Sequence, residues 1–121
     1  MQNKISKVKV GAVDYDIKLL PSREEEIYGS CVYQHQLIYL TPNMLHQQAS
    51  DTLLHEVMHA IWREAGLDHY KDLDEEDIIR TMATWLRIVI VNNPQFATFI
   101  VDASKLWNHK PKSDPDKVAV S

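Results

Sequence analysis

The sequence predicts a small α+β domain, because strand patterns fill its first third and helical patterns follow. Apolar and polar residues alternate strictly from Val13 to Leu19, which indicates a half-buried strand. From Thr41 onward, apolar residues recur with the helical period instead. We therefore expect a small N-terminal antiparallel sheet packed on three helices.

The strand region contains turn signals that divide it into short elements. A first strand over residues 8–10 is expected to turn at residues 11–12 into a second strand over residues 13–19. Residues 22–26 are a polar loop or a short helical turn, and residues 31–33 and 37–40 form a hairpin.

Capping residues and prolines mark three helices. The first begins at Thr41-Pro42, or alternatively at Ser50-Asp51, and ends at Gly66. The second opens with Asp72, three residues before Glu75 in a pattern that resembles a capping box, and runs to about Asn92. The third runs from Asn93-Pro94 to about Trp107. We expect a single domain over residues 1–108 and a flexible tail over residues 109–121.

Composition narrows the function classes. The 121 residues carry a net charge of -4, which argues against a nucleic-acid binder because phosphate contacts need a basic face. One cysteine excludes an internal disulfide framework. No apolar run is long enough for a signal peptide or a membrane span, so we expect a cytoplasmic protein without a membrane partner. The oligomeric state is left open.

Residues 55–59 read His-Glu-Val-Met-His, the HExxH pattern of zinc sites. Two residues four apart on a helix differ by about 40° in direction, so both imidazoles can bind one ion. Glu56 lies about 100° further round from His55, where a carboxylate can act as base on a metal-bound water.

The surroundings of the motif favour a metal site. Five polar residues form one stripe of the predicted helix: Thr52, His55, Glu56, His59 and Arg63. Apolar residues fill nearly all other directions, so we expect the helix to be buried on most sides. Buried polar groups need partners, and a metal ion supplies them. The alternative is a pair of buried histidines satisfied by local hydrogen bonds.

A catalytic zinc site needs a third protein ligand. The extended HExxHxxGxxH pattern is excluded, because Trp62 and Ala65 stand where it requires glycine and histidine. The acidic start of the next helix, Asp74–Asp77, is the natural source, although such acids also complement a helix N-terminus. Glu75 lies at the centre of that helix's apolar stripe and Glu76 at its edge, so the pattern does not choose between them. Other candidates are His69, Asp68, Asp72 and Cys31.

Over residues 52–61, Thr-Leu-Leu-His-Glu-Val-Met-His-Ala-Ile, the chain resembles a small zincin metallopeptidase. It is most similar to the short zinc peptidases encoded by bacteriophages and prophages, and more distantly to the ImmA/IrrE and SprT-like groups. The resemblance covers roughly residues 13–96 and rests mainly on the HExxH motif.

The resemblance implies a gluzincin-like site, in which His55 and His59 bind Zn2+ and Glu56 is the catalytic base. It also implies a third ligand three residues before an apolar position and seven before an alanine. Glu76 matches, with Ile79 and Ala83, and is preferred to Glu75. The SprT-like groups use a later histidine, for which His69 is the one counterpart found.

The expected function is a zinc-dependent metallopeptidase that hydrolyses a peptide bond by Glu-assisted attack of zinc-bound water. A peptide or protein substrate would lie along an edge strand near Leu37–Leu40. Five residues are candidates for a second oxyanion donor: Tyr33, Arg63, His69, Tyr70 and His109. Two alternatives stay open. One is a non-catalytic phage-type regulatory or binding protein with a structural or vestigial zinc site, and the other is a zinc amidohydrolase acting on a small molecule.

Overall fold

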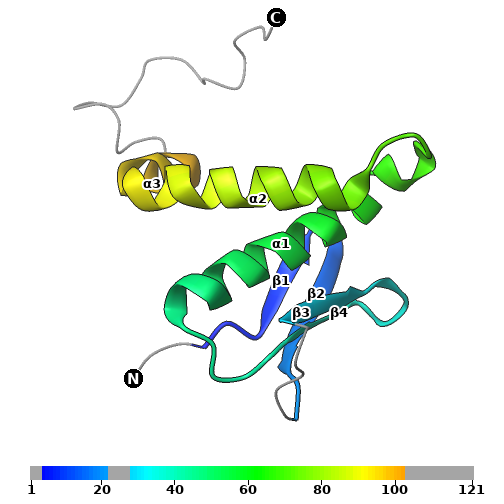
Figure 1. The fold of residues 1–121 in the computed structure, drawn as a ribbon, viewed down its shortest axis with the longest axis horizontal. Helices are drawn as coiled ribbons and strands as arrows, with labels where there is room; N and C mark the ends of the chain where they lie inside the picture. The colour runs from blue at the N-terminus through cyan, green and yellow to red at the C-terminus, as the bar shows by residue number, and fades with distance from the viewer. Residues whose placement is uncertain (1–3, 22–27, 103–121) are drawn as a thin grey trace, which may run out of the picture. The chain divides into compact units, whose positions relative to one another are not determined.

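The sheet and helices form the α+β fold that the sequence predicts (Figure 1). The structure is a computed structural model that describes residues 4–21 and 28–102. Within these residues the elements are β1 (Lys7–Val10), β2 (Val13–Leu19), β3 (Gly29–Val32), the 3-10 turn η1 (Tyr33–His35), β4 (Leu37–Leu40), α1 (His46–Glu64), the 3-10 turn η2 (Leu67–His69), α2 (Glu75–Asn92) and α3 (Pro94–Val101).

Close contacts divide the chain into two units, Met1–Arg87 and Ile88–Ser121, with the boundary inside α2. The first unit contains the sheet, α1 and the first turns of α2. The single domain over residues 1–108 stays a prediction, and the polar loop at 22–26 and the tail at 109–121 lie outside the described residues.

The sheet is mixed, whereas the sequence led us to expect an antiparallel one. Its order is β1-β2-β4-β3. β1 pairs with β2, and β3 with β4, in antiparallel fashion, but β2 and β4 are parallel. The two hairpins were predictable from local turns, and Gly11 at the first of them has a φ of 62°. The way the hairpins join was not, because it depends on pairing between distant segments.

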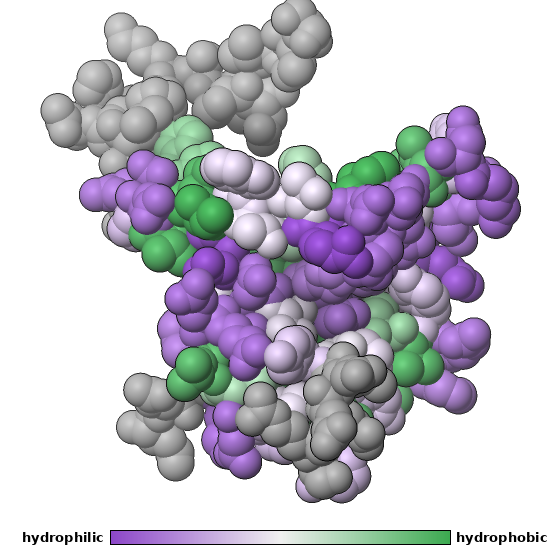
Figure 2. All heavy atoms as spheres, in the orientation of Figure 1, coloured by the Kyte–Doolittle hydropathy of each residue, from purple (hydrophilic) through white to green (hydrophobic). Residues whose placement is uncertain are grey.

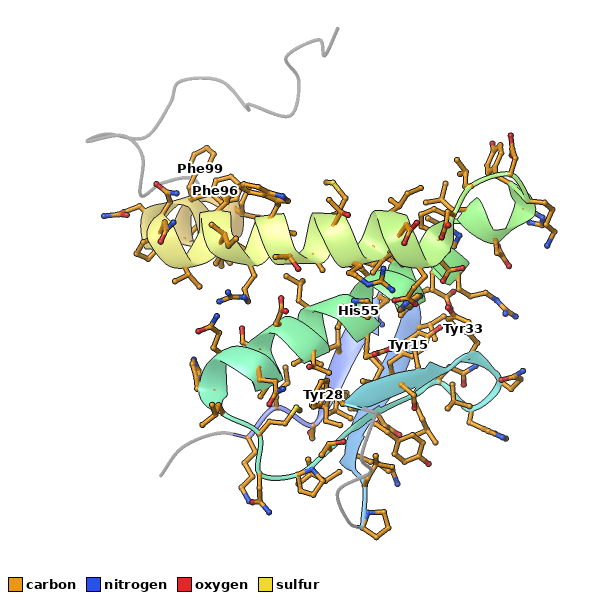
Figure 3. All side chains as sticks on the ribbon, in the orientation of Figure 1. Tyr15, Tyr28, Tyr33, His55, Phe96 and Phe99 are labelled. Atoms are coloured by element: carbon orange, nitrogen blue, oxygen red, sulfur yellow. The ribbon has the colours of Figure 1, made fainter. Side chains whose placement is uncertain are left out.

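One face of the sheet packs against α1. The core between them contains Tyr15 and Ile38, both fully buried, and Ala60 of α1 (Figure 3). The Tyr15 hydroxyl donates a hydrogen bond to Glu64 Oε2 at 2.7 Å, which ties the middle of β2 to the end of α1. The opposite face of β2 carries exposed polar residues, as the alternation predicts. α1 is correspondingly enclosed, and every residue from Gln48 to Ala60 is partly or fully buried.

The first helix begins at His46, between the two predicted starts at Thr41-Pro42 and Ser50-Asp51. Thr41 N–H donates a hydrogen bond to the Tyr28 carbonyl at 2.8 Å, so Thr41 continues the strand pairing instead of capping a helix. Asn43 follows with a φ of 63°, a left-handed conformation that interrupts a helix. The predicted end is confirmed, because Gly66 has a φ of 79° just after α1.

The second helix is capped by Asp74 and not by Asp72. Asp74 Oδ1 accepts a hydrogen bond from the Asp77 N–H at 3.1 Å, which satisfies one of the free N–H groups of the first turn. In the other unit, α3 begins at Pro94 as predicted but ends at Val101. Residues 103–107, where the third helix was expected to end, lie outside the described residues. None of the described helices has the length and apolar character needed to cross a membrane.

Candidate metal centre

The HExxH motif spans the third and fourth turns of α1, and its first residue, His55, contacts Glu76 at the start of α2 (Figure 3 labels His55). His55 and His59 are partly buried, with side-chain exposures of 23% and 14%. Their ring centres are 4.9 Å apart. The helical spacing therefore brings both imidazoles together, as the sequence predicts.

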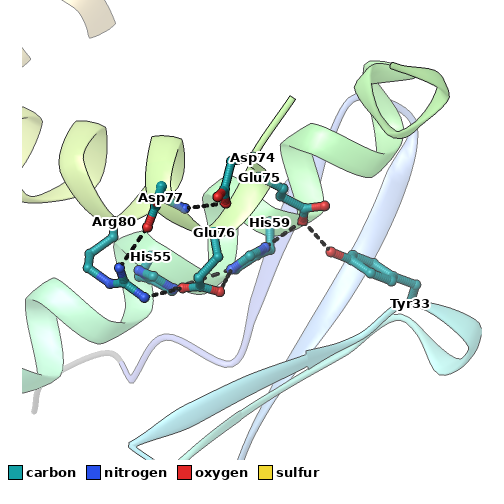
Figure 4. A network of polar contacts seen from close by, with 8 residues as sticks. All are labelled: Tyr33, His55, His59, Asp74, Glu75, Glu76, Asp77 and Arg80. Carbon is teal, nitrogen blue, oxygen red and sulfur yellow. Dashed lines mark hydrogen bonds and ion pairs between the residues drawn. The ribbon is translucent and has the colours of Figure 1, made fainter. Parts of the chain in front are cut away.

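Glu76, in the first turn of α2, completes a group of three ligand atoms (Figure 4). His55 Nε2 and His59 Nε2 are 3.2 Å apart. Glu76 Oε1 lies 2.8 Å from His55 Nε2, and Glu76 Oε2 lies 3.2 Å from His59 Nε2. Ile79 and Ala83, on the same face of α2 as Glu76, are the buried residues of that helix. The face that packs is thus the one that carries Glu76.

The donor set fits zinc. Zinc–nitrogen bonds of about 2.0–2.1 Å at tetrahedral angles place neighbouring ligand atoms about 3.4 Å apart, slightly more than the spacing seen here. Two imidazoles and one carboxylate are also the ligands of known hydrolytic zinc sites. Across the described residues, no other His, Cys, Asp or Glu atom joins the group. Three protein ligands leave the fourth tetrahedral position open.

Glu56 lies beside these three residues, and all four side chains line one pocket. It is 7% exposed. Burial raises the pKa of its carboxyl, the electrostatic interaction with His59 lowers it, and the charge of Glu76 raises it, so that the net pKa is about 7. A carboxyl with a pKa near neutral can both accept and return a proton at physiological pH.

Glu75 lies on the far side of the His59 ring and is not part of the three-ligand group. Its Oε2 is 2.6 Å from His59 Nδ1 and accepts a hydrogen bond from the Tyr33 hydroxyl at 3.0 Å (Figure 4). Sequence reasoning named Tyr33 only as one of several oxyanion donors. Its contact with Glu75 carried no sequence signal, because the two residues are 42 positions apart.

The remaining candidates for a third ligand lie away from the group. His69 is exposed in η2, and Asp68 is 4.0 Å from Arg63. Asp72 is exposed before α2 begins. Cys31 lines the same pocket but is not within reach of all three ligand atoms. Burial, followed by the charges of nearby glutamates, raises the pKa of its thiol to about 12, which opposes the thiolate form that binds metals.

Of the candidate oxyanion donors, Tyr33 is the one that lines this pocket in the described part of the chain. Arg63 lies with its guanidinium 5.3 Å from the centre of the Tyr33 ring, in a cation–π contact. Tyr70 is 60% exposed and His69 is also exposed. His109 lies outside the described residues.

Two adjoining pockets, of about 510 and 460 Å³, form a cleft that runs past the three ligands. Both are lined by Gly29, His55, Glu56 and Glu76. The first pocket extends toward Tyr33 and Glu75, and the second toward Asp51 and Arg80. Hydrophilic residues cover the first turns of α2 that border the cleft (Figure 2).

Gly29 is a site residue that sequence reasoning missed. A Cβ atom at this position would lie 2.8 Å from Thr52 Cγ2, 2.9 Å from the Tyr39 carbonyl oxygen and 3.3 Å from Glu56 Cγ. The missing side chain therefore lets β3 approach α1 closely at Glu56. The one available signal was that a chain with only three glycines places one of them two residues before a predicted strand.

Comparison of the chain with protein-family models, with curated proteins and with solved structures gives no match.

Proposed function

We propose that this protein is a zinc-dependent metallopeptidase of the small zincin type. The observation that carries the proposal is the convergence of His55 Nε2, His59 Nε2 and the Glu76 carboxylate, each 2.8–3.2 Å from the next, beside a buried glutamate. Membership of the phage-type zinc peptidases and a cytoplasmic setting are parts of the same proposal and rest on the sequence.

When bound, a zinc ion would supply a water with a pKa of about 7 and would polarise the scissile carbonyl. His55, His59 and Glu76 hold the ion. Glu56 accepts the proton of the attacking water and passes it to the departing amine. Burial among the site residues raises the pKa of its carboxyl above the ordinary value, which favours a group that takes up and returns a proton.

The substrate strand is expected along β3, and the earlier assignment to Leu37–Leu40 is wrong. β4 lies between β2 and β3, so both of its edges are paired. β3 has a free edge among the described strands, and three of its residues line the first pocket. Thr41 N–H donates to the Tyr28 carbonyl, so residues 28, 30 and 32 face β4. The backbone groups of Gly29 and Cys31 then face the free edge, where an extended peptide can pair with them.

The site geometry weighs against a structural zinc site. Structural sites are closed by four protein ligands, and the described residues bring three together. An open cleft next to a free strand edge also suits a peptide better than a small molecule. The zinc amidohydrolase alternative uses the same water chemistry, and its version with a cysteine ligand is disfavoured by the position of Cys31.

The test compares the full chain with its Glu56→Gln variant, using Asp77→Asn as the control. Asp77 lies in the same acidic turn and contacts Arg80 instead of the histidines. We expect one zinc per chain in all three proteins. Hydrolysis of a mixed peptide library should fall about 10²- to 10⁴-fold in Glu56→Gln only. A wild-type chain without zinc overturns the site, and equal hydrolysis by wild type and Glu56→Gln overturns the peptidase.

A further inference from the structure

Two side chains outside the ligand group converge on the ring of His59. Glu75 Oε2 lies 2.6 Å from His59 Nδ1, on the side of the ring opposite to the nitrogen that faces His55. The same oxygen accepts the Tyr33 hydroxyl at 3.0 Å. Tyr33 belongs to the turn between β3 and β4, so this chain of contacts joins the sheet, α2 and α1 (Figure 4).

The chemistry of these contacts determines which nitrogen of His59 is free. An ionised carboxylate only accepts hydrogen bonds, so Nδ1 must carry the proton in the contact with Glu75. An imidazole that binds a metal is neutral and keeps one proton, so a proton held on Nδ1 by Glu75 leaves Nε2, the nitrogen that faces His55 and Glu76, as the one that can bind the ion. A metal binds the unprotonated nitrogen only.

Tyr33 acts on the same arrangement from one residue further away. Its hydroxyl has a single proton, which is donated to Glu75 and is not available to a substrate carbonyl in this conformation. Burial, the hydrogen bond to Glu75 and the charge of Glu75 raise the pKa of Tyr33 above its ordinary value, so the hydroxyl stays a donor. The Arg63 guanidinium lies over its ring at 5.3 Å, a second contact that packs against Tyr33.

We propose that Glu75 and Tyr33 are positioning residues, which hold His59 in the tautomer and ring orientation that bind the metal. The inference rests on the zinc site of the proposed function but not on peptide hydrolysis. Glu75 acts directly on His59, and Tyr33 acts through Glu75.

The test is a zinc titration against a competing chelator, made on the full chain. Glu75→Ala should weaken zinc binding about 10- to 100-fold. Glu75→Gln keeps an acceptor oxygen without the charge and should recover part of the loss. Tyr33→Phe removes one hydrogen bond and should weaken binding about 2- to 10-fold. Asp77→Ala is the control and should bind zinc like wild type, because Asp77 contacts Arg80 and neither histidine.

A double variant separates Tyr33 from Glu75. If Tyr33 acts through Glu75, adding Tyr33→Phe to Glu75→Ala should cause no further loss of affinity. A second readout is the proton on His59 Nδ1 in the zinc-loaded protein, whose NMR signal should be present in wild type and Glu75→Gln and lost by exchange in Glu75→Ala. Circular dichroism checks that each variant is folded. If Glu75→Ala does not fold, the two single variants Glu75→Gln and Tyr33→Phe provide the test.

The outcomes distinguish this inference from the peptidase proposal. The positioning roles are overturned if Glu75→Ala binds zinc as tightly as wild type. They are also overturned if Tyr33→Phe lowers the zinc affinity by the same factor in wild type and in Glu75→Ala. A wild-type chain that binds no zinc overturns them together with the site. The expected series of affinities in a protein that cleaves no peptide supports the positioning roles while the peptidase proposal fails.

Discussion

Replacing Gly29 by alanine tests whether the close approach of β3 to α1 shapes the candidate site. The added Cβ would meet the Tyr39 carbonyl oxygen at 2.9 Å and Thr52 Cγ2 at 2.8 Å. Both distances are shorter than ordinary van der Waals contact, so β3 must shift against the backbone of β4 at Tyr39 and against the Thr52 side chain of α1. Glu56 Cγ, 3.3 Å from the same position, must move as well.

The expected cost follows from this crowding. Overpacking of this kind destabilises a fold by about 1–3 kcal/mol. A chain of this size loses roughly 4 °C of Tm for each kcal/mol, so Tm should fall by roughly 4–12 °C. The smaller backbone entropy of alanine in the unfolded chain opposes this by about 0.4–1 kcal/mol, which places the result toward the lower end. Peptide hydrolysis should fall further than stability explains, because Glu56 is displaced from its place beside the ligands.

The assay is thermal unfolding by circular dichroism, together with hydrolysis measured well below Tm. Gly11→Ala is the matched control. Gly11 has a φ of 62° and nothing within 4 Å of its Cβ position, so alanine there strains the turn without touching the site. We expect Gly11→Ala to lower Tm and leave hydrolysis unchanged. A Gly29→Ala protein as stable and as active as wild type would refute the reasoning, because the close approach would then not depend on the missing side chain.

Three further predictions concern the site. Glu76→Gln should weaken zinc binding more than about 100-fold in a competition with a chelator, because Glu76 is itself a proposed ligand. Asp77→Asn should leave the affinity unchanged, since Asp77 pairs with Arg80, and equal affinities of the two variants would remove Glu76 from the site. In metal-free protein, burial raises the pKa of the Glu56 carboxyl from 4.5 to about 7. The protonated carboxyl therefore stabilises the fold fully below pH 4.5, and this stabilisation is lost as the pH rises through 7. Measured by urea unfolding, the free energy of unfolding of Glu56→Gln relative to wild type should therefore rise by about 3 kcal/mol from about pH 4.5 to about pH 8. A difference in stability that does not change with pH would contradict the burial effect. The Cys31→Ser variant should bind zinc like wild type, and loss of zinc would make Cys31 a ligand. In the wild-type chain the Cys31 thiol, with a pKa of about 12, should react slowly with iodoacetamide at pH 8.

Most of the local structure could be predicted from the sequence. The alternation in residues 13–19, the glycine at the first turn and the Asn93-Pro94 boundary each act over a few residues, and each appears in the structure as expected. Thr41 misled the prediction because its local pattern resembles a helix start, while a hydrogen bond to Tyr28 continues the strand pairing instead.

The same division holds within the site. The four-residue spacing of His55 and His59 brings their rings together on any α-helix, and Glu56 takes its position from the same helix. The choice between Glu75 and Glu76 depended on which face of α2 packs. The apolar pattern of α2 did not choose between them, whereas in the structure the buried residues Ile79 and Ala83 follow Glu76 by three and seven positions and Glu76 meets both histidines.

By itself, the sequence determined a helix that brings two imidazoles together with a glutamate beside them, because helical geometry is local and periodic. Only the tertiary structure decided that the sheet is mixed, that β3 is the free edge beside the cleft, and that Tyr33 reaches Glu75. These features arise where segments more than 20 residues apart pack together, and their position depends on the shape of the core and not on any short stretch of the chain.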